Sequence, residues 1–198
     1  MLYKSTRGYS EKFSFSDAVL TGIAPDGGLF VPEEFPTLNE AALEKLCELD
    51  YCSLAREIFS LFADDFTKEE LDTCVKNAYA DGSFPEEPTP LSVLSNNLSV
   101  LELWHGPTSA FKDMALQILP EFMSVAIKKS KKHNKIAILT ATSGDTGKAA
   151  LAGFKDAENV NIMVFYPVSG VSEMQKTQMI TQEGSNLSVV AVRGNFDD

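Results

Sequence analysis

Several features that would point to a particular class of protein are scarce or missing in these 198 residues. The three cysteines, Cys47, Cys52 and Cys74, have neither C-x-x-C spacing nor nearby histidines, which argues against a zinc cluster. We expect reduced, mostly buried thiols in a cytoplasmic protein. No apolar run approaches the roughly 20 residues that span a bilayer, and the first residues do not form a signal peptide, so we expect no membrane partner.

Excess positive charge is also missing. The net charge of -11 would repel a phosphate backbone, so we expect no nucleic-acid partner. The one lysine-rich stretch, residues 128–135, falls where a helix should end, and cations are favourable at that end of a helix dipole. With 44% apolar and 23% charged residues, the composition is that of an ordinary globular protein.

Residues 1–90 are expected to form a mostly helical N-terminal domain. The sequence PDGG at residues 25–28 predicts a tight turn before a short apolar strand. Helical spacing follows over residues 38–49, over 54–62 with Ser53 as a possible cap, and over 67–78, where Thr67 and Glu70 predict a capping box. The buried stripe expected on this last helix is Leu71, Cys74, Val75 and Ala78.

Residues 91–198 alternate between strand and helix patterns, which is typical of an α/β fold with a parallel sheet. After a strand candidate at 100–104, a helix is predicted over 109–132 with a kink or break at Pro120. A βαβαβ unit is predicted over 135–192, with buried strands at 136–140, 162–166 and 187–192 and helices at 147–156 and 172–182. Since the sequence ends directly after a strand, we expect a truncated fold.

The first segment with chemical potential is ATSGDTG at residues 141–147, between a strand and a helix. Ligands bind at the carboxyl ends of parallel strands, and free N–H groups at a helix start attract anions. A P-loop is excluded, because Thr142 stands where its first glycine belongs and Ala149 where its magnesium-binding hydroxyl belongs. An ordinary glycine-rich, capped turn remains an alternative interpretation.

The second segment is WHGPTSAFKD at residues 104–113. Lys112 would stand just inside a helix beside apolar Phe111 and Met114, and both the dipole and the loss of water disfavour an ammonium there. Such an amine is suited to condensing with a carbonyl. A surface lysine beside Asp113 is the alternative. For His105 we favour a structural hydrogen bond, because no carboxylate partner is evident nearby in the sequence.

These two segments resemble the lysine motif and the second motif of threonine synthases, which are pyridoxal 5'-phosphate enzymes of fold type II. The stretch at residues 24–32 (APDGGLFVP) and the pairs at 166–167, 171–172 and 178–179 are similar too, and in the same order. The resemblance implies a mostly helical N-terminal domain followed by three-layer αβα parallel sheets. It covers all of this sequence but only about half of such an enzyme.

The activity implied by the resemblance is conversion of O-phospho-L-homoserine and water into L-threonine and phosphate. Lys112 would be the catalytic, cofactor-bound lysine. The other cofactor-binding residues implied are Ser143, Gly144, Asp145, Thr146 and Gly147. Many fold relatives have Asn where this chain has Asp145, and a carboxylate beside the cofactor's ring oxygen would repel it unless one of the two is protonated.

The loop for the cofactor phosphate is expected beyond residue 198, so a polypeptide ending there should not turn over. Two alternatives remain: another fold-type II lyase or dehydratase acting on serine or threonine, and a catalytically inactive homologue that binds phosphorylated hydroxy-amino compounds. The PDGG segment and the helical N-terminal part favour the synthase, and the retained Lys112 argues against the inactive binder.

Overall fold

The computed structural model of the chain describes residues 1–80, 82–130, 135–142 and 144–194. Its contacts group into two compact units. The first consists of Met1–Asp81 and Glu121–Lys132, and the second of Gly82–Pro120 and His133–Asp198. The domain division into residues 1–90 and 91–198 stays a prediction, because the two units defined by contacts have other boundaries.

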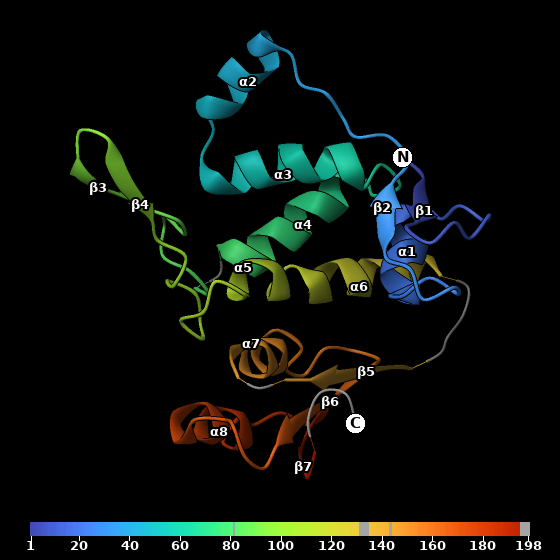
Figure 1. The fold of residues 1–198 in the computed structure, drawn as a ribbon. Coiled ribbons are helices and arrows are strands. Elements are labelled where there is room, and N and C mark those ends of the chain that lie inside the picture. Colours follow the sequence, from blue (N-terminus) through green and yellow to red (C-terminus); the bar gives the residue numbers. More distant parts are fainter. Residues whose placement is uncertain (81, 131–134, 143, 195–198) are drawn as a thin grey trace. The chain divides into compact units, whose positions relative to one another are not determined.

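The first unit is mostly helical (Figure 1). Its strands β1 (Tyr3–Ser5) and β2 (Phe30–Pro32) pair antiparallel, and its helices are α1 (Phe15–Thr21), α2 (Glu40–Cys47), α3 (Tyr51–Phe62), α4 (Lys68–Tyr79) and most of α6 (Leu119–Lys129). Phe122 on α6 joins α1, α3 and the connection between α3 and α4. Its ring meets those of Phe15, Phe59 and Phe66 edge-on, with centroids 5.0–5.7 Å apart. Edge-to-face contacts of this kind stabilise a core beyond the area that they bury.

Local hydrogen bonds explain where the helices of the first unit begin. The capping box of α4 is confirmed: the Thr67 hydroxyl accepts the Glu70 N–H, and the Glu70 carboxylate accepts the Thr67 N–H. The proposed cap of α3 was wrong. Asp50, not Ser53, precedes the helix, and its carboxylate accepts the Ser53 N–H at 3.0 Å. Helix α1, capped by Ser14, was not predicted, because its seven residues are too few to display a periodic pattern.

The stripe predicted on α4 is buried, Cys74 included. Burial raises the pKa of the Cys74 thiol to about 12, so this group stays protonated and unreactive. The expectation of mostly buried thiols was wrong for the other two, since Cys47 is exposed and Cys52 is half-buried; all three are free. Cys47 is exposed because α2 buries none of its residues.

The second unit contains a hairpin and the predicted βαβαβ unit. The hairpin strands are β3 (Leu91–Ser95) and β4 (Leu98–Leu101), and the remaining elements are α5 (Asp113–Leu116), β5 (Ile136–Ala141), α7 (Asp145–Gly153), β6 (Val160–Pro167), α8 (Glu173–Ile180) and β7 (Leu187–Val192). The last three strands form a parallel sheet in the order β5-β6-β7. The parallel βαβαβ unit is thereby confirmed. The strand candidate at 100–104 is correct only for its first two residues, because β4 ends at Leu101 and pairs antiparallel with β3.

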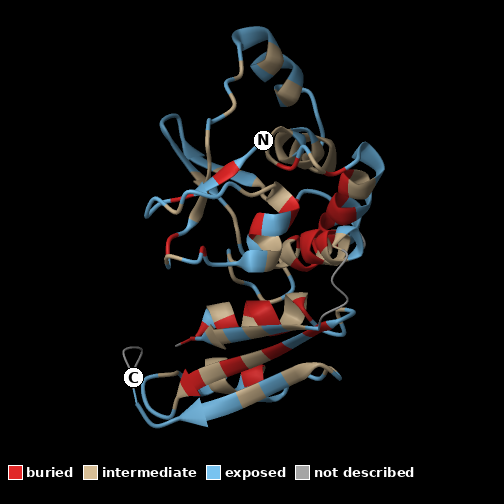
Figure 2. Cartoon of the chain, turned by 90° about the vertical axis from the view of Figure 1, so that its right-hand side faces the viewer, coloured by how far each residue is buried: buried red, intermediate tan, exposed pale blue. Residues whose placement is uncertain are grey.

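Burial in the parallel sheet is concentrated on its middle strand. Figure 2 shows the buried residues along β6, while β7 is mostly exposed. The expectation of three buried strands is therefore correct only for β6; Leu139 on β5, for example, is 70% exposed. Among the described residues, no helix has the length and apolar character required to cross a membrane.

The helix predicted over 109–132 is two helices. Ser109 takes a φ of 57°, a left-handed conformation that a helix cannot include, so α5 begins only at Asp113. A break was predicted at Pro120, and it falls just before that residue, which lies in the first turn of α6 where a missing N–H costs nothing. Phe111, which the predicted helix included, precedes α5 and is 61% exposed.

Gly153, the last residue of α7, lies close to the backbone at the end of α5. A Cβ atom there would lie 1.9 Å from the Leu116 carbonyl oxygen at the end of α5. We expect Gly153→Ala to lower the free energy of unfolding by about 1–3 kcal/mol, measured by denaturant titration. The sign of the change in the free energy of unfolding is informative. Where a helical glycine has no such neighbour, its exchange for alanine stabilises a protein by up to about 1 kcal/mol. A stabilised variant would contradict this packing of α5 on α7.

Candidate active site

A pocket of about 400 Å³ in the second unit brings together the two segments that the sequence singles out. Lys112, half-buried directly before α5, lies on one side, with its Nζ 4.2 Å from the centroid of the Phe111 ring. A cation over an aromatic face is weakly attracted to it. The other residues that line the pocket are Ala141, Thr142, Gly144, Asp145, Thr146 and Gln175.

The turn between β5 and α7 is organised by the buried hydroxyl of Thr142. Its Oγ1 accepts the N–H of Gly144 at 3.1 Å and that of Gly147 at 3.2 Å. Within the described part of the chain, the N–H groups of Asp145 and Thr146 have no hydrogen-bond partner. Since these groups belong to the first turn of a nine-residue helix, the turn presents donors and a positive dipole end to the pocket.

Four of the six residues proposed for the site line this pocket: Lys112, Gly144, Asp145 and Thr146. Gly147 is buried beneath the turn instead, where a Cβ atom would lie 2.4 Å from the Thr142 methyl group and 2.8 Å from the Met179 sulfur. Ser143 lies outside the described residues. The roles given to the six residues stay predictions.

Asp113 fixes the loop before Lys112 through hydrogen bonds to Thr108. This side chain is fully buried, and its two oxygens accept the Thr108 N–H at 2.8 Å and the Thr108 hydroxyl at 2.6 Å. Gly106 leaves the space for it, since a Cβ atom there would lie 2.6 Å from Asp113 Oδ2. Asp113 therefore does not pair with Lys112 on the surface, as the alternative interpretation supposed.

Two other ionisable residues, Lys148 and His105, lie outside this pocket. Lys148, at the position of a P-loop lysine, donates to the Gln182 side chain. Burial lowers the pKa of Lys148, and the attraction of the Asp113 carboxylate opposes that shift.

His105 makes the structural hydrogen bond that we favoured. Its Nε2 lies 2.6 Å from Glu102 Oε2, so the expectation of no carboxylate nearby was wrong. The Ser92 hydroxyl and then the His105 ring hold the pKa of Glu102 below its usual value. Glu102 was overlooked because it was taken as part of a strand, three residues before His105, whereas β4 ends at Leu101.

Two pocket residues were missed at the sequence level. Thr142 was not among the proposed site residues, although it belongs to the 141–147 segment and the capped-turn alternative called for a hydroxyl before the helix. Gln175 had a local signal as well, since Ser172-x-x-Gln175 has the form of a capping box, and the structure contains that box. Its contact with Asp145, 30 residues away, has no counterpart in the sequence pattern.

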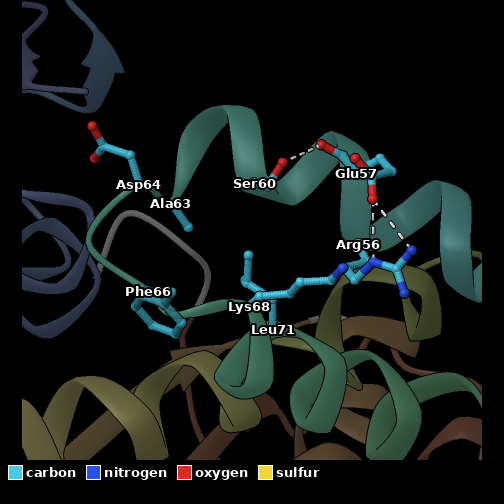
Figure 3. A pocket seen from close by; sticks show the side chains of 8 residues that line it. All are labelled: Arg56, Glu57, Ser60, Ala63, Asp64, Phe66, Lys68 and Leu71. Carbon is cyan, nitrogen blue, oxygen red and sulfur yellow. Dashed lines mark hydrogen bonds and ion pairs between the residues drawn. The ribbon is translucent and has the colours of Figure 1, made fainter.

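A second cavity, of about 380 Å³, lies in the first unit along α3 and α4 (Figure 3). Charges of both signs line it, including Arg56, Glu57, Asp64 and Lys68. The Arg56 guanidinium is engaged by the carboxylates of Asp72, at 3.0 Å, and Glu57, at 3.2 Å. This cavity therefore favours no particular charge of ligand, and it contains none of the residues of the two sequence segments.

Comparisons with known proteins agree with one another. Residues 2–79 match the family described as "Threonine synthase N terminus". Threonine synthase of Schizosaccharomyces pombe is 40% identical over 99% of this chain, and human "Threonine synthase-like 2" is 39% identical over all of it. The chain spans about 40% of the length of these curated relatives.

Solved structures give the same result. The structure of PLP-bound threonine synthase from Brucella melitensis superimposes with a TM-score of 0.90 at 37% identity, covering all of this chain and 42% of that one. Yeast threonine synthase gives a TM-score of 0.89 at 34% identity, covering 99% of this chain and 41% of that one. The fold is thus the α/β fold of pyridoxal-phosphate enzymes of this type, as predicted. Over its whole length the chain matches the N-terminal portion of threonine synthases.

Proposed function

We propose that the protein containing this chain is a threonine synthase that binds pyridoxal 5'-phosphate and converts O-phospho-L-homoserine and water into L-threonine and phosphate. The observation that carries the proposal is the pocket shared by the Lys112 side chain and the turn that opens α7. An amine and a set of anion-attracting N–H groups facing one cavity match a substrate that offers a carboxylate and a cofactor that offers an aldehyde.

The residues at the pocket fit this cofactor. Among the described residues the Lys112 ammonium has no ion-pair partner, so no carboxylate competes for it. Bound at Lys112, pyridoxal phosphate would supply an electron sink for charge that develops at the carbons of the substrate. Gly144, Asp145 and Thr146, at the start of α7, line the same pocket as Lys112.

The chain's own groups account for the remaining requirements. Lys112 Nζ, once freed by the substrate amine, would remove a proton at the α carbon and serve as the base at the β carbon. The N–H groups at the start of α7 and the Thr146 hydroxyl would bind the substrate carboxylate. Phosphate would then leave from the γ carbon, and the hydroxyl group of water would add at the β carbon. The two protons removed from the α and β carbons would return to the α and γ carbons, and the remaining proton of water would go to the phosphate, so the reaction balances.

The test is chemical labelling of the full-length protein. Incubation with pyridoxal phosphate, reduction with borohydride and peptide mapping should place the adduct on Lys112. The same preparation should release phosphate from O-phospho-L-homoserine. An adduct with turnover of serine or threonine instead would favour a related lyase or dehydratase, and no adduct at Lys112 would favour the binding-only homologue.

A further inference from the structure

The side-chain amide of Gln175 connects two helix starts at the edge of the pocket. Its Nε2 donates to Asp145 Oδ1 at 2.8 Å, across from α8 to the first residue of α7. Its Oε1 accepts from Ser172, from the hydroxyl at 3.1 Å and from the backbone N–H at 3.4 Å. Both ends of this one amide are therefore in use.

The orientation of the amide follows from the partners. A backbone N–H can only donate, so the atom that faces Ser172 N must be the oxygen of Gln175. The NH₂ group then has to face Asp145, whose ionised carboxylate can only accept. Turning the amide over would place donor against donor at one end and acceptor against acceptor at the other.

Gly144 lies against the same side-chain amide of Gln175. A Cβ atom at Gly144 would lie 2.5 Å from Gln175 Nε2 and 2.8 Å from its Cδ, so the amide rests directly against the turn. The φ of Gly144 is 172°, an extended value that any residue adopts. The glycine is thus needed for the space that Gln175 occupies and not for backbone conformation.

We propose that Gln175 is a positioning residue for the pocket: by holding one oxygen of Asp145, it directs the other toward whatever group of the ligand faces the start of α7. Asp145 is exposed and has no other hydrogen-bond partner among the described residues, so without Gln175 its side chain would be free to rotate into solvent. This role rests on the proposed function, which supplies the ligand.

The glutamate variant separates positioning from capping. Gln175→Glu keeps an acceptor for both Ser172 donors and hence the capping box, yet it has no N–H for Asp145 and sets two carboxylates against each other. Ser172→Ala is the matched control, because it removes the hydroxyl of the cap and leaves the Gln175–Asp145 hydrogen bond in place.

The experiment is a double-mutant cycle on the full-length protein. Two quantities are measured: the Kd for pyridoxal phosphate, and the midpoint pH at which the absorption of the bound cofactor is half changed. Gln175→Glu should weaken cofactor binding about tenfold and shift the midpoint with Asp145 present. In the Asp145→Asn background, where the new amide can donate to the glutamate, the same change should alter Kd less than about twofold. Ser172→Ala should lower the melting temperature and leave both cofactor readouts unchanged.

Equal effects of Gln175→Glu in the two backgrounds, or no effect in either, would overturn the positioning role alone. A wild-type protein that binds no pyridoxal phosphate would overturn the proposed function, and this role with it.

Discussion

Exchanging Lys112 for arginine is expected to lower turnover of O-phospho-L-homoserine by about a thousandfold or more in the full-length protein. Arginine keeps a positive charge near the Phe111 ring, but its guanidinium neither condenses with an aldehyde nor gives up its proton at working pH. The variant should therefore fold and retain the electrostatics of the pocket while losing the chemistry. The measurement is phosphate release, together with borohydride labelling.

The matched control is Lys135→Arg, which makes the same exchange at an exposed lysine that does not line the pocket. It should keep wild-type turnover and wild-type labelling at Lys112. Turnover of Lys112→Arg within tenfold of the wild type would mean that another amine holds the cofactor, and the pocket would then lose its assigned chemistry.

Much of the fold was accessible from the sequence where local signals are strong. Strand β7 was predicted with the bounds that the structure has, Leu187–Val192, because it is a short apolar run between turn residues. The start of α4 followed from a capping box, in which the residues that define the helix end also form its hydrogen bonds. Such elements depend on neighbours within a few positions, so the pattern contains the information.

The elements that were misjudged depend on residues distant in the sequence. The start of α5 is one of them. Its extension back to residue 109 seemed reasonable by periodicity, but the buried Asp113 carboxylate, Gly106 and the approach of Gly153 to Leu116 set the loop instead. Helix propensity is a weak preference that tertiary contacts override.

In the candidate site, too, residues with local sequence signals were recognised and those that depend on distant contacts were not. Lys112 and residues 141–147 were singled out by their residue types at the carboxyl end of a strand and the start of a helix, and the resemblance to threonine synthases supplied their proposed roles. Gln175 was not, because glutamine three residues after Ser172 already has a sufficient local role as part of a capping box. Only the packing of α7 against α8 reveals that the same amide also holds Asp145.

Asp113→Ala is expected to produce the largest loss of stability among simple exchanges near the pocket, about 3 kcal/mol in denaturant unfolding. It removes the acceptor of both Thr108 hydrogen bonds, and a buried donor without a partner costs about 1–3 kcal/mol. Because this loop leads into Lys112, cofactor binding should weaken in parallel. Hydrogen exchange at the Thr108 N–H provides the local measurement, and its protection should disappear.

Asp113→Asn is the control that distinguishes hydrogen bonding from charge. Its amide oxygen can still accept the Thr108 N–H, and its NH₂ can donate to the Thr108 hydroxyl, which accepts as well as donates. The asparagine variant should therefore lose only about 1 kcal/mol and keep the protection of the Thr108 N–H. An asparagine variant as unstable as the alanine variant would contradict this account. The loop would then be held by the negative charge of Asp113, which also attracts the half-buried Lys148, and not by the hydrogen bonds to Thr108.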